Sequence, residues 1–360
     1  MSRPNTKTRE KSAYLRIYER IRNDITNGAY LYGTKLPSKR LMAEETGVSV
    51  ITVEHAYTLL CDEGYIEAIE RSGYFVIYRQ SDFFALDYTD EKKIIEPHSA
   101  GEFKSEFPFS VMAKAMRKVL NDYGESILEK ESNKGCPELR REISKYLARS
   151  RGIMATPSQI VIGSGAEYLY GMIVTLLGRS RVYAIEKPSY RKIEMVYSIN
   201  GVELDNLPLV GGGIDSRSLS ETKASVLHIT PYRSYPSGVT ATVSKRKEYL
   251  YWCSLGDRYI IEDDFESEFT PAKKPEETVY SLGNGKNVFY LNTFSKTVSP
   301  ALRVGYMVLP NDFIELFDKK ISFYTCPVSA FEQLVLAELI SNGSFERHIN
   351  RVRRQKRKLQ

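Results

Sequence analysis

The N-terminal part of the chain has the spacing of three short helices. Apolar side chains recur near the helical period over residues 14–27, and Asn27-Gly28 ends that helix. Ser38 is placed to cap a second helix, which ends at Thr46-Gly47, and Ser49 is placed to cap a third. In the third helix, positions i, i+3, i+4 and i+7 form an apolar stripe of Val53, Ala56, Tyr57 and Leu60.

A hairpin follows these helices. Two short apolar runs, 65–67 and 74–76, flank the turn Arg71-Ser72-Gly73 and predict two strands. Three helices and a hairpin predict an α+β winged helix-turn-helix domain over residues 1–78, with the turn at 47–50 directing the third helix toward a DNA major groove. The face of the third helix opposite the stripe carries Val50, Ile51, Thr52, Glu54 and His55.

The remainder of the chain has a different pattern. Residues 79–106 lack sustained periodicity and are expected to be a linker. From residue 107 to 360, short apolar runs alternate with helical patterns, which predicts an α/β domain with a largely parallel sheet. Strands are expected at 159–162, 181–185, 202–207, 225–230, 258–262, 287–291 and 304–309, and helices at 110–121, 138–151, 167–177, 189–200, 243–255 and 329–341.

Charge is unevenly distributed along the chain. The 360 residues carry a net charge of +6, but residues 1–40 alone hold ten Lys and Arg against three acidic residues. A basic N-terminal patch beside a helix-turn-helix pattern indicates nucleic acid, although a solvated helix face has the same composition. A second basic run, Arg347 to Lys358, is interpreted as such a solvated face.

Composition excludes several classes of protein. The four cysteines are widely spaced, which argues against a zinc site or a disulfide framework. The N-terminus is polar and charged, and no apolar run is long enough to cross a membrane. We therefore expect a cytoplasmic protein with no membrane partner and no metal.

Polar loops follow the expected strands of the second domain, at the sheet edge where α/β proteins bind ligands. The loop after strand 159–162 begins with Gly163-Ser164-Gly165 and leads into a helix, which is the arrangement of a phosphate-binding turn. The loop after strand 287–291 carries Lys296 among hydroxyls, with Arg303 seven residues later. A lysine amine can bond covalently to a carbonyl carbon, and an arginine can hold a phosphate.

Residues 12–78, which contain "LPSKRLMAEETGVSVITVEHAY", resemble the DNA-binding domain of the GntR regulators. The resemblance implies a homodimer on a double-stranded DNA operator. Many relatives carry Arg where this chain has Val50, and some carry a basic residue at the position of Glu54, so the operator sequence stays open. The DNA contacts that it implies are Ser38 and Arg40 at phosphates, Ser49 and Thr52 at the groove end of the third helix, and Ser72 and Gly73 at the minor groove.

Residues 107–355 resemble the fold-type-I, aminotransferase-like domain of the MocR subgroup of those regulators. The resemblance rests on an ordered set of motifs: "IVIGSGAEYL", "EKPSY", "TPYRSYPSG", "IIEDDFESEF" and "NTFSKTVSPALRVGY". It implies pyridoxal 5'-phosphate bound covalently to Lys296, with Asp263 on its pyridine nitrogen and Tyr190 stacked on its ring. The implied phosphate ligands are Gly165, Ala166, Thr293, Ser295 and Arg303.

The same comparison exposes departures from the subgroup pattern. Phe265 stands where relatives have a tyrosine whose hydroxyl binds the cofactor, so we expect binding with little or no transamination. Relatives also continue past the position of Gln360, which predicts either a fragment or a protein without the C-terminal subdomain. In that case the helix at 329–341 would expose Phe331, Leu334, Val335, Leu336 and Leu339 and lower the solubility.

Three functions remain open from the sequence. The first is a transcriptional regulator that senses a small amine or amino acid through pyridoxal phosphate. The second is an active aminotransferase with an attached DNA-binding domain. The third is a regulator whose second domain only dimerises.

Overall fold

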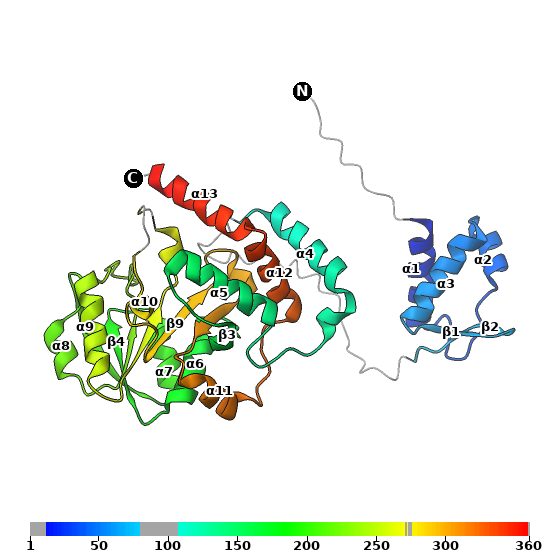
Figure 1. Ribbon diagram of the computed structural model, residues 1–360. Coiled ribbons are helices and arrows are strands. Elements are labelled where there is room, and N and C mark those ends of the chain that lie inside the picture. The colour runs from blue at the N-terminus through cyan, green and yellow to red at the C-terminus, as the bar shows by residue number, and fades with distance from the viewer. Residues whose placement is uncertain (1–11, 80–106, 271, 273–275, 359–360) are drawn as a thin grey trace. The chain divides into compact units, whose positions relative to one another are not determined.

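The chain divides into two compact units, Met1–His98 and Ser99–Gln360. Figure 1 shows the elements of each unit, coloured from blue at the N-terminus to red at the C-terminus. The computed structural model describes residues 12–79, 107–270, 272 and 276–358. Most of the expected linker at 79–106 therefore lies outside the described residues.

The first unit is a helix-turn-helix domain with a hairpin wing. Ser38 Oγ accepts a hydrogen bond from the Leu41 N–H at 3.2 Å, and Ser49 Oγ accepts one from the Thr52 N–H at 3.1 Å, so both expected caps are confirmed. The expected stripe of the third helix is also confirmed, since all four of its side chains are fully buried. The elements are α1 Ala13–Thr26, α2 Lys39–Thr46, α3 Val50–Asp62 and the antiparallel strands β1 Ile66–Ile69 and β2 Gly73–Val76.

The second unit is built on an eight-stranded sheet in the order β3-β10-β9-β8-β7-β4-β5-β6. The central strands β9, β8, β7, β4 and β5 are parallel, whereas β10 runs antiparallel to both of its neighbours. A parallel sheet of this kind needs helices on both faces. The strands are β3 Ile160–Gly163, β4 Val182–Lys187, β5 Glu203–Val210, β6 Gly213–Ile214, β7 Val226–Ile229, β8 Tyr259–Asp263, β9 Val288–Thr293 and β10 Gly305–Val308.

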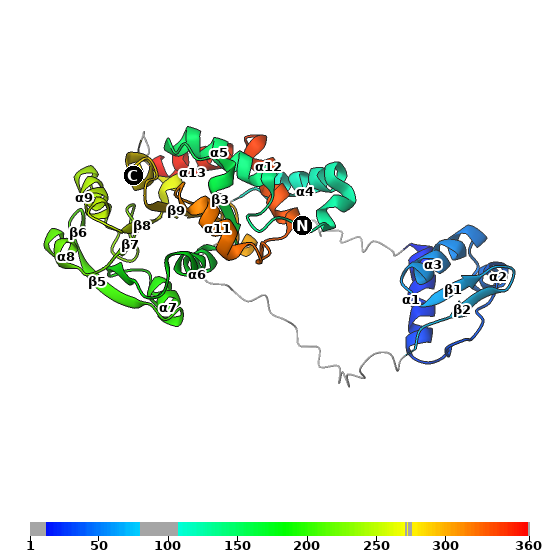
Figure 2. The same cartoon turned by 60° about the horizontal axis from the view of Figure 1, so that its bottom comes forward.

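Two buried clusters show which helices cover each face of the sheet. Helices α6, α7 and α11 pack on one face of the sheet. The cluster on the other face includes side chains from α4, α5, α9, α10, α12 and α13 (Figure 1 and Figure 2). The short elements β6, α8 and α11 were not expected from the sequence. The helices are α4 Phe109–Tyr123, α5 Pro137–Arg151, α6 Ala166–Leu177, α7 Arg191–Ile199, α8 Ser216–Glu221, α9 Val243–Ser254, α10 Val279–Leu282, α11 Phe313–Ile321, α12 Ala330–Ser341 and α13 Ser344–Lys358.

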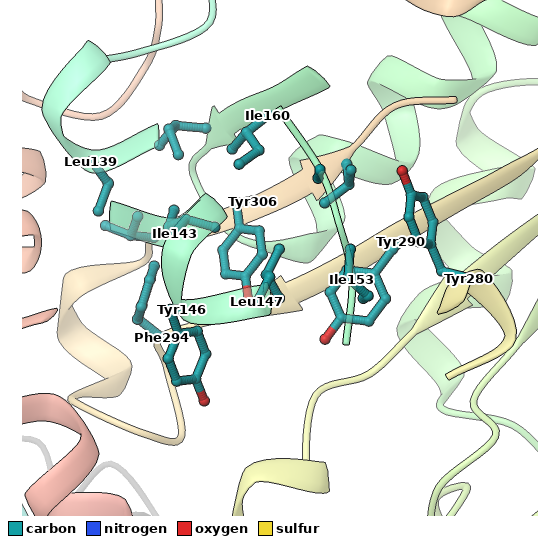
Figure 3. Close-up of a cluster of buried hydrophobic side chains, with 14 of the residues drawn as sticks. Leu139, Ile143, Tyr146, Leu147, Ile153, Ile160, Tyr280, Tyr290, Phe294 and Tyr306 are labelled. Carbon is teal, nitrogen blue, oxygen red and sulfur yellow. The ribbon is translucent and has the colours of Figure 1, made fainter. Parts of the chain in front are cut away.

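Helix α5 covers the end of the sheet where β3, β10 and β9 lie side by side. Leu139, Ile143 and Leu147 follow one another at intervals of four along α5 and are fully buried. Figure 3 shows these side chains directed toward Tyr306 of β10 and Ile160 of β3. This packing fixes Arg151, the last residue of α5, against the sheet.

The expectation of an exposed apolar helix at 329–341 is wrong. Leu334, Val335, Leu336 and Leu339 of α12 are at most 5% exposed, and Phe331 is partly buried. Helices α4 and α5 of the same unit and the following helix α13 pack against α12. The unit therefore covers this helix itself, and the predicted low solubility loses its structural basis.

In the part of the chain that the structure describes, no helix is both long enough and apolar enough to cross a membrane.

Candidate cofactor and DNA sites

The N-terminus of α6 forms a turn suited to an anion. Gly165 caps this helix with φ +92°, a conformation that favours glycine, and Ala166 is the first helical residue. A Cβ on Gly165 would lie 2.9 Å from Arg303 Nη2, so the guanidinium rests directly against the turn. A Cβ on Gly305 would lie 3.3 Å from both Gly165 and Thr293. The fold thus gathers Gly165, Ala166, Thr293 and Arg303 at one helix N-terminus, where backbone N–H groups attract negative charge.

An acidic residue already holds the basic groups of this turn. Arg303 Nη2 donates a hydrogen bond to Glu167 Oε2 at 2.8 Å, and Lys192 Nζ donates to Glu167 Oε1 at 3.2 Å. Burial opposes ionisation of Glu167, but hydrogen bonds from its own backbone N–H, from Arg303 and from Lys192 outweigh it and lower its pKa. The carboxylate is therefore charged and competes with any other anion for Arg303.

Asp263 ends β8 with one unpaired carboxylate oxygen. The Tyr170 hydroxyl donates to Asp263 Oδ2, and His228 Nε2 lies 3.9 Å from the same oxygen. Burial, followed by the charge of Asp263, raises the pKa of Tyr170, so the phenol keeps its proton and donates it. Asp263 Oδ1 is buried and has no hydrogen-bond partner among the described residues. A buried oxygen of this kind is ready for a donor from a ligand.

Lys296 lies in the loop after β9, beside the loop that follows β8. Its Nζ donates to the Glu266 carboxylate and lies 4.3 Å from the centroid of the Phe265 ring. The side chain is 24% exposed, so the amine is reachable from solvent. Ser295, its neighbour, is half-buried. The structure therefore places Lys296 against Phe265 and Glu266, which follow Asp263 by two and three residues in sequence.

Tyr190 stands at the rim of this region. It is 40% exposed and precedes α7 as its N-cap residue. Its ring meets Tyr235 edge-on with centroids 6.0 Å apart, and Lys192 Nζ lies 5.9 Å from its centroid. Because Lys192 also bonds Glu167, Tyr190 is linked to the α6 turn.

The groups of this region match the chemistry of pyridoxal phosphate. Asp263 Oδ1 has no hydrogen-bond donor among the described residues, and a pyridinium nitrogen would provide one. The α6 turn with Arg303 suits a phosphate. Lys296 supplies an amine. The residues present therefore fit the group. Phe265 contributes a ring at Lys296 and no hydroxyl donor.

Sequence reasoning missed several residues of this region. Tyr170 and His228 support Asp263 from α6 and β7, and Glu167 and Glu266 pair with Arg303 and Lys296. A signal existed for His228, because a polar residue interrupts an otherwise apolar strand. The Tyr197 hydroxyl and His228 Nδ1 are 2.7 Å apart, which satisfies the other ring nitrogen.

The opposite face of β8 carries a second set of buried charges. Asp264 lies 3.2 Å from Arg151 Nη2 and accepts a hydrogen bond from the Tyr290 hydroxyl at 2.8 Å. Glu268 Oε2 lies 3.9 Å from the same guanidinium nitrogen, and burial raises the pKa of Glu268. Burial also raises the pKa of Glu262 to about 8, while this side chain accepts bonds from two backbone N–H groups at the start of α10. These groups fix the end of β8.

In the first unit, most of the residues expected to contact DNA are exposed, whereas Thr52 and Gly73 are half-buried. Ser38, Arg40 and Ser49 are exposed, and the Ser49 and Thr52 hydroxyls are 2.8 Å apart. Ser72 is exposed at the tip of the wing. The backbone of Gly73 has φ +113°, and a Cβ there would lie 3.1 Å from Lys35 Cε, so glycine lets the wing approach this lysine.

Comparison with known families covers most of the chain. Residues 13–76 match the bacterial regulatory proteins of the gntR family. Residues 99–360 match aminotransferase class I and II. The two matches fall on the two compact units.

Individual relatives share this combination. An uncharacterized HTH-type transcriptional regulator of Bacillus subtilis, YdeL, is 33% identical over 96% of this chain and 77% of its own length. The probable rhizopine catabolism regulatory protein MocR of Rhizobium meliloti is 28% identical over 94% of this chain and 73% of its own. The pyridoxine biosynthesis transcriptional regulator PdxR of Corynebacterium glutamicum is 26% identical over 94% and 75%.

Solved structures resemble the second unit. The kynurenine aminotransferase of Pyrococcus horikoshii superposes with a TM-score of 0.63 at 26% identity, over 69% of this chain. The chain spans 64% of the length of that aminotransferase, which is less than two thirds.

Proposed function

We propose a function from the premise that this chain belongs to the MocR-type regulators, in which a gntR-family helix-turn-helix domain is joined to an aminotransferase class I and II domain. The chain is an HTH-type transcriptional regulator with an aminotransferase-like unit. In this proposal it binds a duplex operator as a homodimer and holds pyridoxal phosphate in the second unit. A small amine or amino acid that reaches the cofactor changes the affinity for DNA.

The DNA-binding part of the proposal rests on α3 and the basic N-terminal segment. Dimeric helix-turn-helix proteins place such a helix in the major groove of each half-site. Arg40 is exposed at the start of α2 and would contact a phosphate together with Ser38. Ser49 and Thr52 would lie at the groove end of α3, and Ser72 and Gly73 would approach the minor groove.

The cofactor part is carried by one observation, the buried and unpaired Oδ1 of Asp263. Asp263 would hold the pyridine nitrogen through Oδ1, while the Tyr170 hydroxyl donates to its other oxygen and His228 Nε2 lies 3.9 Å from that oxygen. The α6 turn with Thr293, Ser295 and Arg303 would hold the phosphate, and Lys296 would bond to the carbonyl carbon. When bound, pyridoxal phosphate supplies an electron sink and a carbonyl that primary amines attack.

Regulation requires that the amine ligand change the contacts of residues in this chain. Lys296 now lies against Glu266 and the Phe265 ring. Lys296 would be held either by the cofactor or by Glu266, and a change of partner that accompanies amine binding would alter the loop after β8. A ligand shifts an equilibrium only by its differential affinity for two states, and this exchange of partners provides such a difference.

Phe265 favours sensing over turnover. A hydroxyl at this position would contribute one hydrogen bond, worth about 0.5–1.5 kcal/mol, so its absence still permits binding. The Phe265 ring instead contacts the Lys296 amine. An active aminotransferase remains the second candidate, which product formation distinguishes.

The proposal is tested with the full chain, loaded with pyridoxal phosphate, on a duplex selected from a randomised library. A panel of amino acids and small primary amines is added while the affinity for the duplex is measured. We expect at least one compound to change the affinity in the wild type. Lys296→Ala should bind the duplex with unchanged affinity and show no response.

Lys187→Ala is the control, because Lys187 pairs on the surface with Glu194 and should respond as the wild type does. A response that persists in Lys296→Ala would contradict the proposal. Repeated release of the keto product would favour the aminotransferase.

A further inference from the structure

The outward face of α3 carries an exposed apolar side chain at its tip. Ile51 is 77% exposed and Val50 is 40% exposed, whereas the buried face of the helix holds the stripe described above. Positions three, four and seven residues apart share a helix face, so Ile51 lies in line with Glu54, His55 and Thr58. Ile51 is the member of this row nearest the helix N-terminus.

The polar members of the row already have partners within the domain. Glu54 Oε1 accepts from Lys39 Nζ at 2.6 Å, and this pairing offsets a negative charge that would repel DNA phosphates. The His55 ring lies against Tyr14 with centroids 4.9 Å apart. Thr58 Oγ1 donates to the Glu54 carbonyl at 2.9 Å. Ile51 is the one apolar member of this row of four and is 77% exposed.

An exposed isoleucine at the groove end of α3 has one chemical counterpart in the major groove. The bases there present hydrogen-bonding atoms, except that thymine also presents its C5 methyl group. We propose that Ile51, with Val50 beside it, reads thymine methyl groups and so selects A·T base pairs in each half-site. This inference rests on the DNA-binding function proposed above and adds the class of sequence recognised.

The expected energy is that of burying a methyl group. Removing one buried methyl should weaken binding about fourfold, which corresponds to about 0.8 kcal/mol. Contacts of lysine or arginine side chains with phosphates would not depend on this methyl group, because phosphates carry no sequence information.

The test exchanges thymine for deoxyuracil, which differs only in lacking the methyl group. Duplexes selected from a randomised library by the full chain are synthesised with deoxyuracil at each thymine in turn. We expect about fourfold weaker binding at one or more thymines of each half-site. Ile51→Ala should lose most of this difference and leave only the part that Val50 contributes, and Ile51→Val should retain most of it.

Leu31→Ala is the matched control, since Leu31 is an apolar side chain of the same unit that is 68% exposed and lies outside α3. It should keep the full dependence on thymine. Equal binding to all thymine and deoxyuracil duplexes by the wild type would overturn the inference while sparing the proposed function. An Ile51→Ala protein that changes its oligomeric state but keeps the thymine dependence would also overturn it. No binding to any duplex would refute both.

Discussion

One charged pair from each unit differs strongly in its exposure to solvent. In the DNA-binding unit, Lys39 pairs with Glu54, and their side chains are 32% and 51% exposed. In the aminotransferase-like unit, Arg151 pairs with Asp264, and their side chains are only 2% and 4% exposed. An exposed pair gains little because water screens it, whereas a buried charge must be compensated by its partner. Residues that meet DNA can therefore change without unfolding the protein, while the charges behind β8 are part of the fold.

The largest expected effect comes from replacing the cation of each pair with methionine. Arg151→Met leaves Asp264 and Glu268 without their cation and should lower the free energy of unfolding by about 3–5 kcal/mol. Lys39→Met should cost less than about 1 kcal/mol. Urea unfolding followed by circular dichroism measures both, and fluorescence of Trp252 reports the second unit alone, where the single tryptophan lies. Equal losses in the two variants would contradict the comparison.

Local features of both units were predictable because they depend on neighbours in sequence. The stripe on α3 and the caps Ser38 and Ser49 follow from helical spacing and from side-chain oxygens placed before it. Strand β8 shows the limit. Its end carries two adjacent aspartates, which the alternation of a strand turns to opposite faces. The motif assigned Asp263 to the cofactor, but the partners of each aspartate come from distant segments.

Burial of α12 illustrates the same limit in the apolar residues. Its sequence shows apolar positions on every side, and the pattern alone does not reveal what packs against them. Helices α4 and α5 provide that cover from about two hundred residues earlier in the chain, a relation that only the three-dimensional fold displays. Glu167 was missed for a similar reason, because Arg303 and Lys192 reach it from distant segments of the chain.

A buried carboxyl group in β4 should make the stability of the second unit depend on pH. Burial raises the pKa of Glu186 from 4.5 to about 8, so the folded state holds a proton that the unfolded state loses. Stability from this group is present below pH 4.5 and falls as the pH rises to about 8, by at most about 1.4 kcal/mol for each pH unit. Glu186→Gln should flatten this fall in unfolding experiments at several pH values.

Glu203 is a matched control for Glu186, because it is exposed on the adjacent strand β5. Glu203→Gln should keep the slope of the wild type. A slope unchanged in Glu186→Gln would show that this carboxyl group is ionised in the fold.

The smallest expected effect concerns competition at the α6 turn. Glu167 holds Arg303 and Lys192, so a phosphate must share or displace this carboxylate. Glu167→Gln should strengthen binding of pyridoxal phosphate about two- to fivefold, as expected for a partly exposed ion pair. Fluorescence titration with the cofactor measures this change. As a control, Glu194→Gln removes a carboxylate from α7 and should have no effect. Weaker binding in Glu167→Gln would instead mean that Glu167 orients Arg303 for the phosphate.

Lys296 is the residue through which we propose that the second unit holds pyridoxal phosphate. The most direct test is to incubate the full chain with the cofactor, reduce it with borohydride, and locate the added mass by peptide mass spectrometry. We expect one modified peptide, with the cofactor on Lys296, and no modification at this position in Lys296→Ala. A cofactor found on another lysine, or on none, would contradict this proposal and favour a unit that only dimerises.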